Sequence, residues 1–190
     1  MSRIIGGVAG GRRLSMPKGQ STRPTSDRVR EGLFSSLGGD LSGRAFLDLY
    51  AGSGAVGLEA ASRGATTVVM VERDARAVAA IRSNAAAVAL PSVVVRAEAV
   101  ARFLAEPVVT AFDPKPFDPK PFDIVFLDPP YADPVADVLA RLVDGGWLAA
   151  DGVVVVERAT RDEAPIWPPG LVEDRSRRYG DSTLWYGRRP

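Results

Sequence analysis

The residues with the clearest chemical potential are Asp128, Pro129, Pro130 and Tyr131, which directly follow the apolar stretch Asp123–Leu127. A short apolar run of this kind is typical of a buried strand, so the four residues are expected at a strand's carboxyl end. The Asp128 carboxylate and the Pro129 carbonyl can each accept a hydrogen from an amino group, and the proline ring restricts that carbonyl by fixing φ. The Tyr131 ring can stack on a flat base that has been flipped out of its helix. This combination predicts a site for the exocyclic amine of a nucleic-acid base.

Such an amine is a poor nucleophile because its lone pair is delocalised into the ring. Acceptors for both of its hydrogens let the lone pair turn toward a reactive methyl group, and the Asp128 carboxylate offsets the positive charge that grows on nitrogen. The alkylated nitrogen then loses a proton easily, so no histidine base is needed, and the sequence contains no histidine. Asp128, Pro129 and Tyr131 are therefore the predicted catalytic residues of an amine methylation.

A glycine motif, Gly52-x-Gly54-x-x-Gly57, lies between the predicted strand Ala45–Tyr50 and a predicted helix. Glycines at this spacing let the chain turn sharply and bring backbone N–H groups close to a ligand. Glu72 ends the next predicted strand, where a carboxylate can bind ribose hydroxyls. These features alone also fit a nicotinamide-dependent oxidoreductase.

Further acidic residues favour a cofactor without phosphates. Asp48 precedes the glycine motif, and its negative charge would repel a phosphate but attract a cationic amino acid group. Glu98 and Ala99 follow the third predicted strand, in position to meet an adenine ring. S-adenosylmethionine has an α-amino group, a ribose and an adenine but no phosphate, so it is the predicted cofactor.

The amino-acid composition excludes several other kinds of site. The chain has 190 residues, is 46% hydrophobic and contains neither cysteine nor histidine. Disulfides, the usual zinc sites, cysteine nucleophiles and Ser-His-Asp triads are thereby excluded, and no metal site is predicted. No apolar run approaches the roughly 18 residues that cross a bilayer. The N-terminus lacks a signal peptide's apolar core, so a cytoplasmic location without membrane attachment is expected.

Strands and helices alternate from Arg44 onward, which predicts an α/β fold with a mostly parallel sheet buried on both faces. The clearest helix is Asp74–Leu90. The last strand follows its predecessor without a long helix, which favours an antiparallel edge. A tandem repeat, Phe112–Pro116 followed by Phe117–Pro121, predicts an extended surface loop. The predicted strands are Ala45–Tyr50, Thr67–Glu72, Ser92–Arg96, Phe122–Asp128, Gly152–Glu157 and Thr183–Gly187.

The N-terminal region, residues 1–40, is predicted to be a basic extension of a methyltransferase domain, residues 41–190. Its first residues indicate a small β-hairpin, and Thr25–Leu37 indicates a helix capped by Thr25, Ser26 or Asp27. The net charge of the chain is only +1, but residues 1–30 contain seven basic residues against the single acid Asp27. Clustered cations suggest a polyanionic partner. A second basic cluster comprises Arg175, Arg177 and Arg178. The predicted RNA-binding residues are Arg3, Arg12, Arg13, Arg23, Arg28 and Arg30.

Three segments, Thr22–Glu31, Leu47–Ala60 and Asp128–Tyr131, resemble the bacterial small-subunit ribosomal RNA guanine-N2 methyltransferases. The resemblance extends over nearly the whole chain and implies a Rossmann-like class I methyltransferase fold. It implies methylation of one guanosine in small-subunit rRNA, on partly assembled subunits rather than bare RNA. Nothing in the sequence demands more than a monomer. The repeat before the fourth strand departs from the family pattern. The cofactor residues that the resemblance implies are Asp48, Tyr50, Gly52, Gly54, Glu72, Glu98 and Ala99.

Two other functions fit part of the sequence. A DNA adenine or cytosine amino-methyltransferase would use the Asp128–Tyr131 motif equally well, although 190 residues leave little room for a domain that reads a DNA sequence. A non-catalytic RNA-binding assembly factor would need neither Asp128 nor the glycine motif. Activity on duplex DNA would favour the first alternative, and failure to bind S-adenosylmethionine would favour the second.

Overall fold

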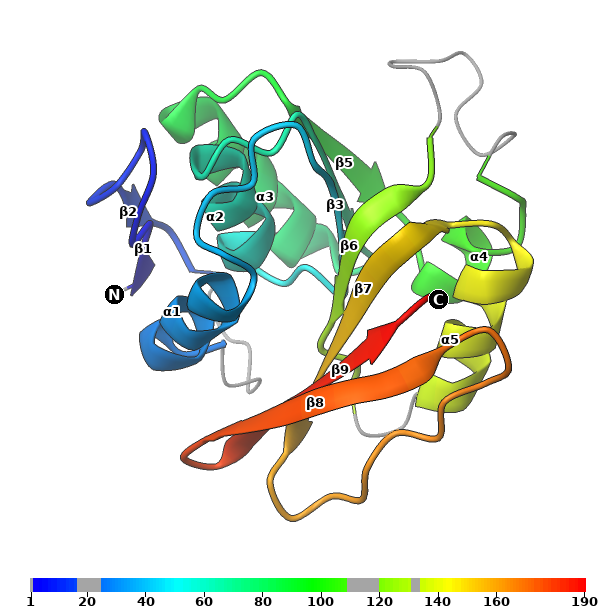
Figure 1. Ribbon diagram of the computed structural model, residues 1–190. Helices are drawn as coiled ribbons and strands as arrows, with labels where there is room; N and C mark the ends of the chain where they lie inside the picture. Colours follow the sequence, from blue (N-terminus) through cyan, green and yellow to red (C-terminus); the bar gives the residue numbers. More distant parts are fainter. Residues whose placement is uncertain (1, 17–24, 109–119, 131–133) are drawn as a thin grey trace.

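The computed structural model describes residues 2–16, 25–108, 120–130 and 134–190 (Figure 1). The described residues contain a seven-stranded sheet in the order β5-β4-β3-β6-β7-β9-β8. Strands β3 to β7 are parallel, whereas β9 pairs antiparallel with both β7 and β8. The strands are β3 (Ala45–Leu49), β4 (Thr67–Glu72), β5 (Val93–Ala97), β6 (Phe122–Leu127), β7 (Leu148–Ala159), β8 (Val172–Tyr179) and β9 (Ser182–Arg188).

Helices cover both faces of this sheet (Figure 1). One face is packed by α1 (Asp27–Ser36), α2 (Ala55–Ser62) and α3 (Ala75–Val88), and the other by α4 (Val100–Phe103) and α5 (Val135–Asp144). Successive strand residues point to opposite faces. Phe46 accordingly joins the core under α1 to α3, whereas Leu47 joins the core under α4 and α5. The predicted α/β fold with a mostly parallel sheet is confirmed.

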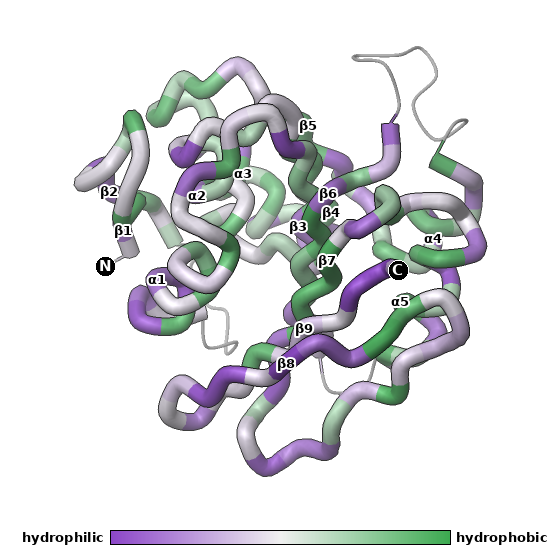
Figure 2. The backbone as a smooth tube through the Cα atoms, viewed as in Figure 1, coloured by the Kyte–Doolittle hydropathy of each residue, from purple (hydrophilic) through white to green (hydrophobic). Residues whose placement is uncertain are grey.

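The C-terminal hairpin differs from the prediction. The last strand, β9, is antiparallel as predicted, but it lies between β7 and an edge strand, β8, that was not predicted. The sequence of β8 is almost entirely polar and its side chains are mostly exposed, so it lacks the apolar pattern that marks a buried strand. Figure 2 shows this contrast between the hydrophobic central strands and the hydrophilic β8. Pairing with β9, rather than burial, keeps β8 extended.

The N-terminal hairpin packs on α2 through one buried acid. Strands β1 (Ser2–Arg3) and β2 (Arg13–Leu14) pair antiparallel, as the sequence predicts. The backbone N–H groups of Ile5 and Gly6 donate to the two carboxylate oxygens of Glu59, at 2.6 and 2.8 Å. Glu59 has no exposed surface. The hairpin is therefore fixed to the α/β fold by buried hydrogen bonds.

Arg30 corrects one prediction. It was expected to contact RNA, but it is fully buried between the hairpin, α1 and α2. Its guanidinium donates to the Arg3 carbonyl at 2.8 Å and to Asp27 at 2.6 Å, and lies 3.7 Å from the Glu59 carboxylate. A buried charge needs such partners. Arg30 is thus a structural residue, because its side chain lies on the packed face of α1, whereas that of Arg28 is exposed.

The start of α1 is capped as expected, because the Ser26 hydroxyl accepts a hydrogen bond from the Val29 N–H at 3.2 Å. None of the described helices is long and apolar enough to span a membrane. Two predicted site residues, Arg23 and Tyr131, lie outside the described residues, as does most of the tandem repeat, residues 112–119.

Candidate active site

The carboxyl ends of β3, β4, β6 and β7 open into one cleft of about 1560 Å³. From β3 the chain runs outward along the sheet through β4 and β5, and it then returns to the opposite side of β3 to form β6, so the strand order reverses between β3 and β6. Ligands of open α/β sheets bind outside the carboxyl ends of strands at such a reversal. The cleft is large enough for a nucleoside cofactor and a base together.

The loop between β3 and α2 has three residues with positive φ. These are Tyr50 (φ 63°), Gly52 (φ 57°) and Gly54 (φ 77°). A β-carbon at Gly52 would meet no atom within 4 Å, so this glycine serves the left-handed turn and leaves the cleft side open. A β-carbon at Gly57 would lie 2.6 Å from the Met70 side chain, so Gly57 lets α2 pack closely on β4. Tyr50 is a non-glycine residue in a conformation that costs energy, which is a common feature of functional sites.

Two acidic residues hold this loop and the start of α2 by accepting hydrogen bonds from backbone N–H groups. The buried Asp48 accepts the Gly57 N–H at 2.8 Å. Glu72 accepts the Gly52 N–H at 2.9 Å with one carboxylate oxygen and the Asp74 N–H at 2.8 Å with the other. Both acids line the cleft. Since a carboxylate accepts about four hydrogen bonds, each retains capacity for a ligand.

Burial raises the pKa of Asp48 to about 7, although the Gly57 N–H opposes the shift, and the Glu72 carboxylate adds to it. The charged form of Asp48 is therefore unfavourable in the empty cleft. A cationic ligand would favour it, because opposite charges attract strongly where water is excluded. The cofactor side of the cleft is thus suited to a positively charged group.

Asp128 directly follows β6 and is half-buried. Glu157 of β7 lies beside it, since the adjacent residues Leu127 and Val156 pair between the two strands. Burial, followed by the carboxylates of Glu157 and Asp48, raises the pKa of Asp128 to about 8. Burial also raises the pKa of Glu157, which is only 7% exposed, against hydrogen bonds from the hydroxyls of Ser182 and Thr25. The two neighbouring carboxyls therefore resist full ionisation near neutral pH.

Glu157 was not among the predicted site residues. In the sequence, Glu157 directly follows the apolar run Val153–Val156, just as Asp128 and Glu72 directly follow apolar runs of their own. The run also shows that its strand belongs in the core. That Glu157 neighbours Asp128 could not be inferred, because the order of strands in the sheet is not written in the order of the chain.

Both ends of the chain complete the walls of the cleft. The Thr25 hydroxyl, which precedes α1, donates to Glu157 at 2.9 Å across 132 positions of sequence. Met16, Thr25 and Ser26 line the cleft from the N-terminal side, and Arg178 and Tyr179 line it from β8. The N-terminal extension is therefore part of the site and not only an attachment to the outside of the fold.

The structure brings most predicted cofactor residues to the cleft. Tyr50, Gly52 and Ala99 line it together with Asp48 and Glu72, and Pro129 lines it with Asp128. Gly54 lies below the surface of the cleft at the start of α2.

Glu98 does not match its expected contact with the cofactor. It is not among the residues that line the cleft, and its carboxylate lies 2.7 Å from the Arg96 guanidinium and 3.8 Å from that of Arg102. Its position one residue before Ala99 in the sequence does not fix which way its side chain turns.

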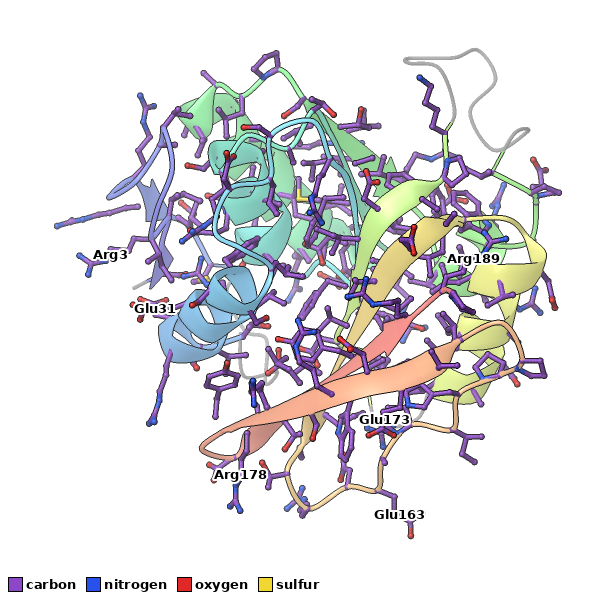
Figure 3. The ribbon with its side chains drawn as sticks, in the orientation of Figure 1. Arg3, Glu31, Glu163, Glu173, Arg178 and Arg189 are labelled. Carbon is purple, nitrogen blue, oxygen red and sulfur yellow. The ribbon has the colours of Figure 1, made fainter. Side chains whose placement is uncertain are left out.

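The remaining predicted RNA-binding residues of the described chain, Arg3, Arg12, Arg13 and Arg28, are exposed. Arg28 of α1 lines a shallow groove together with Arg177 and Arg178 of β8. Figure 3 shows Arg3 projecting from the hairpin and Arg178 near the turn that joins β8 to β9. The two basic clusters of the sequence therefore flank α1, and the second one reaches the cleft through Arg178.

A protein-family model described as conserved hypothetical protein 95 matches residues 2–188. The chain belongs to this family. It is 38% identical over 169 residues to the Escherichia coli (strain K12) protein named ribosomal RNA small subunit methyltransferase D, covering 87% of this chain and 79% of that protein. It is also 36% identical over 179 residues to YlbH of Bacillus subtilis, covering 94% of each.

Solved structures show the same fold. The structure of yhhF from Escherichia coli matches with a TM-score of 0.84 at 32% identity, over 98% of this chain and 97% of that one. An RNA methyltransferase from Salinibacter ruber, in complex with S-adenosyl-L-homocysteine, matches with a TM-score of 0.64 at 20% identity, over 88% of this chain and 94% of that one. The fold is accordingly the Rossmann-like class I methyltransferase fold.

Proposed function

We propose that the protein transfers a methyl group from S-adenosylmethionine to the N2 amine of a guanosine in small-subunit ribosomal RNA. The observation that carries the proposal is the position of Asp128 and Pro129 in the same cleft as the glycine loop and its two acids. The name of the 38% identical relative, a small-subunit rRNA methyltransferase, supports the substrate class.

The residues on the β3 and β4 side fit the cofactor. Asp48 and Glu72 supply negative charge and hydrogen-bond acceptors for an ammonium group and ribose hydroxyls. Gly52 leaves the loop open where a side chain would project, and Ala99 lines the cleft beyond β5. When bound, S-adenosylmethionine supplies an electrophilic methyl group on a positively charged sulfur.

The residues on the β6 side fit the base. Asp128 accepts one hydrogen of the amine and the Pro129 carbonyl accepts the other, so that the nitrogen lone pair is free to react. The negative charge of Asp128 stabilises the cation that develops on nitrogen. Tyr131 remains the proposed stacking partner of the base.

The N-terminal extension, residues 1–40, is proposed to bind RNA through phosphate contacts. Four exposed arginines are available for such contacts: Arg3, Arg12, Arg13 and Arg28. Arg178, which lines both the groove beside α1 and the cleft, extends the basic surface to the cleft. Phosphate contacts fix the position of an RNA without reading its sequence. The target guanosine is then selected by the shape of a partly assembled subunit, as expected for a cytoplasmic enzyme that acts on ribosomes.

The test uses methyl-labelled S-adenosylmethionine with unmodified small subunits, stripped rRNA and duplex DNA in parallel, followed by nucleoside mass spectrometry. N2-methylguanosine on subunits or rRNA is the expected product, and it should be absent with Asp128→Asn. N6-methyladenine or N4-methylcytosine on DNA would replace the proposed substrate by a DNA base. No labelled product, together with no binding of S-adenosylmethionine, would favour an assembly factor.

A further inference from the structure

The amine that is methylated does not by itself distinguish guanine from other bases. Guanine, adenine and cytosine all have an exocyclic amine, but they differ at the adjacent ring nitrogen. In guanine, N1 beside the 2-amino group bears a hydrogen. In adenine and cytosine, the ring nitrogen beside the amine has a lone pair instead. A site that selects guanine therefore needs one more acceptor, next to those that bind the amine.

The structure contains a suitable acceptor in Glu157. Strand β6 lies between β3 and β7, so Asp128 has Asp48 on one side and Glu157 on the other. The glycine loop lies on the Asp48 side, from which the methyl group would come. A base whose amine is bound at Asp128 must extend away from the cofactor, which is the side of Glu157. Both carboxyls line the same cleft.

Glu157 is also held in a fixed position. It is 7% exposed, and the hydroxyls of Thr25 and Ser182 donate to its carboxylate from opposite ends of the chain. Two such bonds leave acceptor capacity for a third. Burying the Glu157 carboxyl beside Asp128 also disfavours the ionised form of both residues. An apolar side chain at position 157 would avoid this free-energy cost, so the carboxyl is better explained by a function than by packing.

We infer that Glu157 is the residue that selects guanine, by accepting the N1–H while Asp128 and Pro129 accept the hydrogens of the amine. The guanine N1–H favours the ionised form of Glu157 by donating to it, and in that form the carboxylate would face the ring lone pair of adenine or cytosine, which is repulsive. The inference rests on the proposed function, and it assigns specificity to a residue outside the Asp128–Tyr131 motif.

The test compares Glu157→Gln with the parent protein on two substrates. Small subunits are reconstituted with either guanosine or 2-aminopurine riboside at the methylated nucleotide. 2-Aminopurine retains the 2-amino group, but its N1 is an acceptor. The parent protein should prefer guanosine by at least about 100-fold in kcat/KM, since a mismatched polar group is left unpaired. Glu157→Gln should reduce that preference at least tenfold, because its amide can donate to N1.

Two controls accompany the comparison. Glu163→Gln makes the same chemical change at an exposed position (Figure 3) and should leave the preference unchanged. The affinity of Glu157→Gln for S-adenosylhomocysteine should stay within a few-fold of the parent value, which shows that the cofactor half of the cleft is intact.

An unchanged preference in Glu157→Gln would overturn the inference, whether or not both rates fall. If the variant methylates neither substrate, the same preference is measured as competition of the two subunits for binding with S-adenosylhomocysteine present, and the same criterion applies. Failure of the proposed function is a separate outcome, because the parent protein would then form no N2-methylguanosine on the guanosine substrate.

Discussion

At the scale of single residues, four acids of similar chemistry have different roles because their surroundings differ. Asp48 is buried under the loop and accepts the Gly57 N–H, whereas Glu72 accepts two backbone N–H groups at the rim. Asp128 and Glu157 instead face one another's charge across β6 and β7. In the proposed reaction, the latter two contact the base.

Replacing Asp128 with alanine separates catalysis from cofactor binding. Turnover should fall by about 100-fold or more, because an acceptor and a negative charge are lost where positive charge develops. Affinity for S-adenosylmethionine should change by only a few-fold, since the glycine loop is untouched. Single-turnover methylation and calorimetric titration measure the two quantities. A large loss of cofactor affinity would show that Asp128 belongs to the cofactor site instead.

The raised pKa values of Asp48 and Asp128, about 7 and about 8, predict how cofactor binding depends on pH. Below pH 6 both carboxyls are mostly protonated and attract a cation weakly, whereas above pH 8 they are mostly ionised. Affinity for S-adenosylmethionine should therefore rise roughly tenfold between pH 6 and pH 8.5. S-adenosylhomocysteine lacks the sulfonium charge, so its affinity should rise less. Equal affinity for S-adenosylmethionine at pH 6 and pH 8.5 would contradict a role for ionised Asp48 in binding a cationic ligand.

At the scale of elements, Gly52 of the loop and Gly57 of α2 have different physical requirements. Gly57→Ala would force a β-carbon to 2.6 Å from Met70, and this overpacking should lower the free energy of unfolding by about 1–3 kcal/mol. Gly52→Ala meets no atom but keeps a positive φ, which costs about 1–2 kcal/mol, and its methyl group would face the cleft. Urea denaturation should show the larger stability loss for Gly57→Ala. Calorimetric titration should show a lower affinity for S-adenosylmethionine in Gly52→Ala, even under conditions where this variant is fully folded.

The basic hairpin is expected to contribute phosphate contacts to RNA binding. Arg12→Glu combined with Arg13→Glu should weaken binding at low salt and make the dependence of log K on log salt shallower by about two units or less. Filter binding or fluorescence anisotropy over a salt series measures this slope. Arg102→Glu, on an 85% exposed side chain of α4 on the other face of the sheet, is the control and should change neither quantity. Unchanged affinity of the double variant would place the RNA surface elsewhere.

At the scale of the whole molecule, one buried ion pair connects the N-terminal hairpin, α1 and α2. Arg30→Met would leave Glu59 without its buried partner on α1 and should lower the free energy of unfolding by about 3 kcal/mol. Arg28 lies on the same helix but is exposed, so Arg28→Met should change the free energy of unfolding by less than about 0.5 kcal/mol. Chemical denaturation followed by fluorescence measures both. Similar values for the two variants would show that the Arg30 network contributes little to stability.

Much of this fold could be predicted because the central strands are apolar and end in polar residues at one edge of the sheet. The predicted strand Thr67–Glu72 matches β4. Asp48 and Glu72 were predicted at a cofactor site and Asp128 at a base site, and the structure brings all three to one cleft, since parallel strands end together. Three features escaped prediction for separate reasons. Strand β8 is polar and is held by pairing alone, and Arg30 looks like its exposed neighbours. Glu157 lies at the cleft because β7 is next to β6 in the sheet, and the order of strands along the chain does not reveal this.

The hydrogen bond from Thr25 to Glu157 has a consequence for the order in which the protein is made. Thr25 and Ser36 contact strands that are synthesised late, with separations of 132 positions for Thr25 and Glu157 and of 150 for Ser36 and Tyr186. Contacts this distant in sequence cannot form until nearly the whole chain has left the ribosome. The N-terminal wall of the cleft therefore closes late, and the proposed activity on ribosomal RNA would begin only after synthesis of the chain is nearly complete.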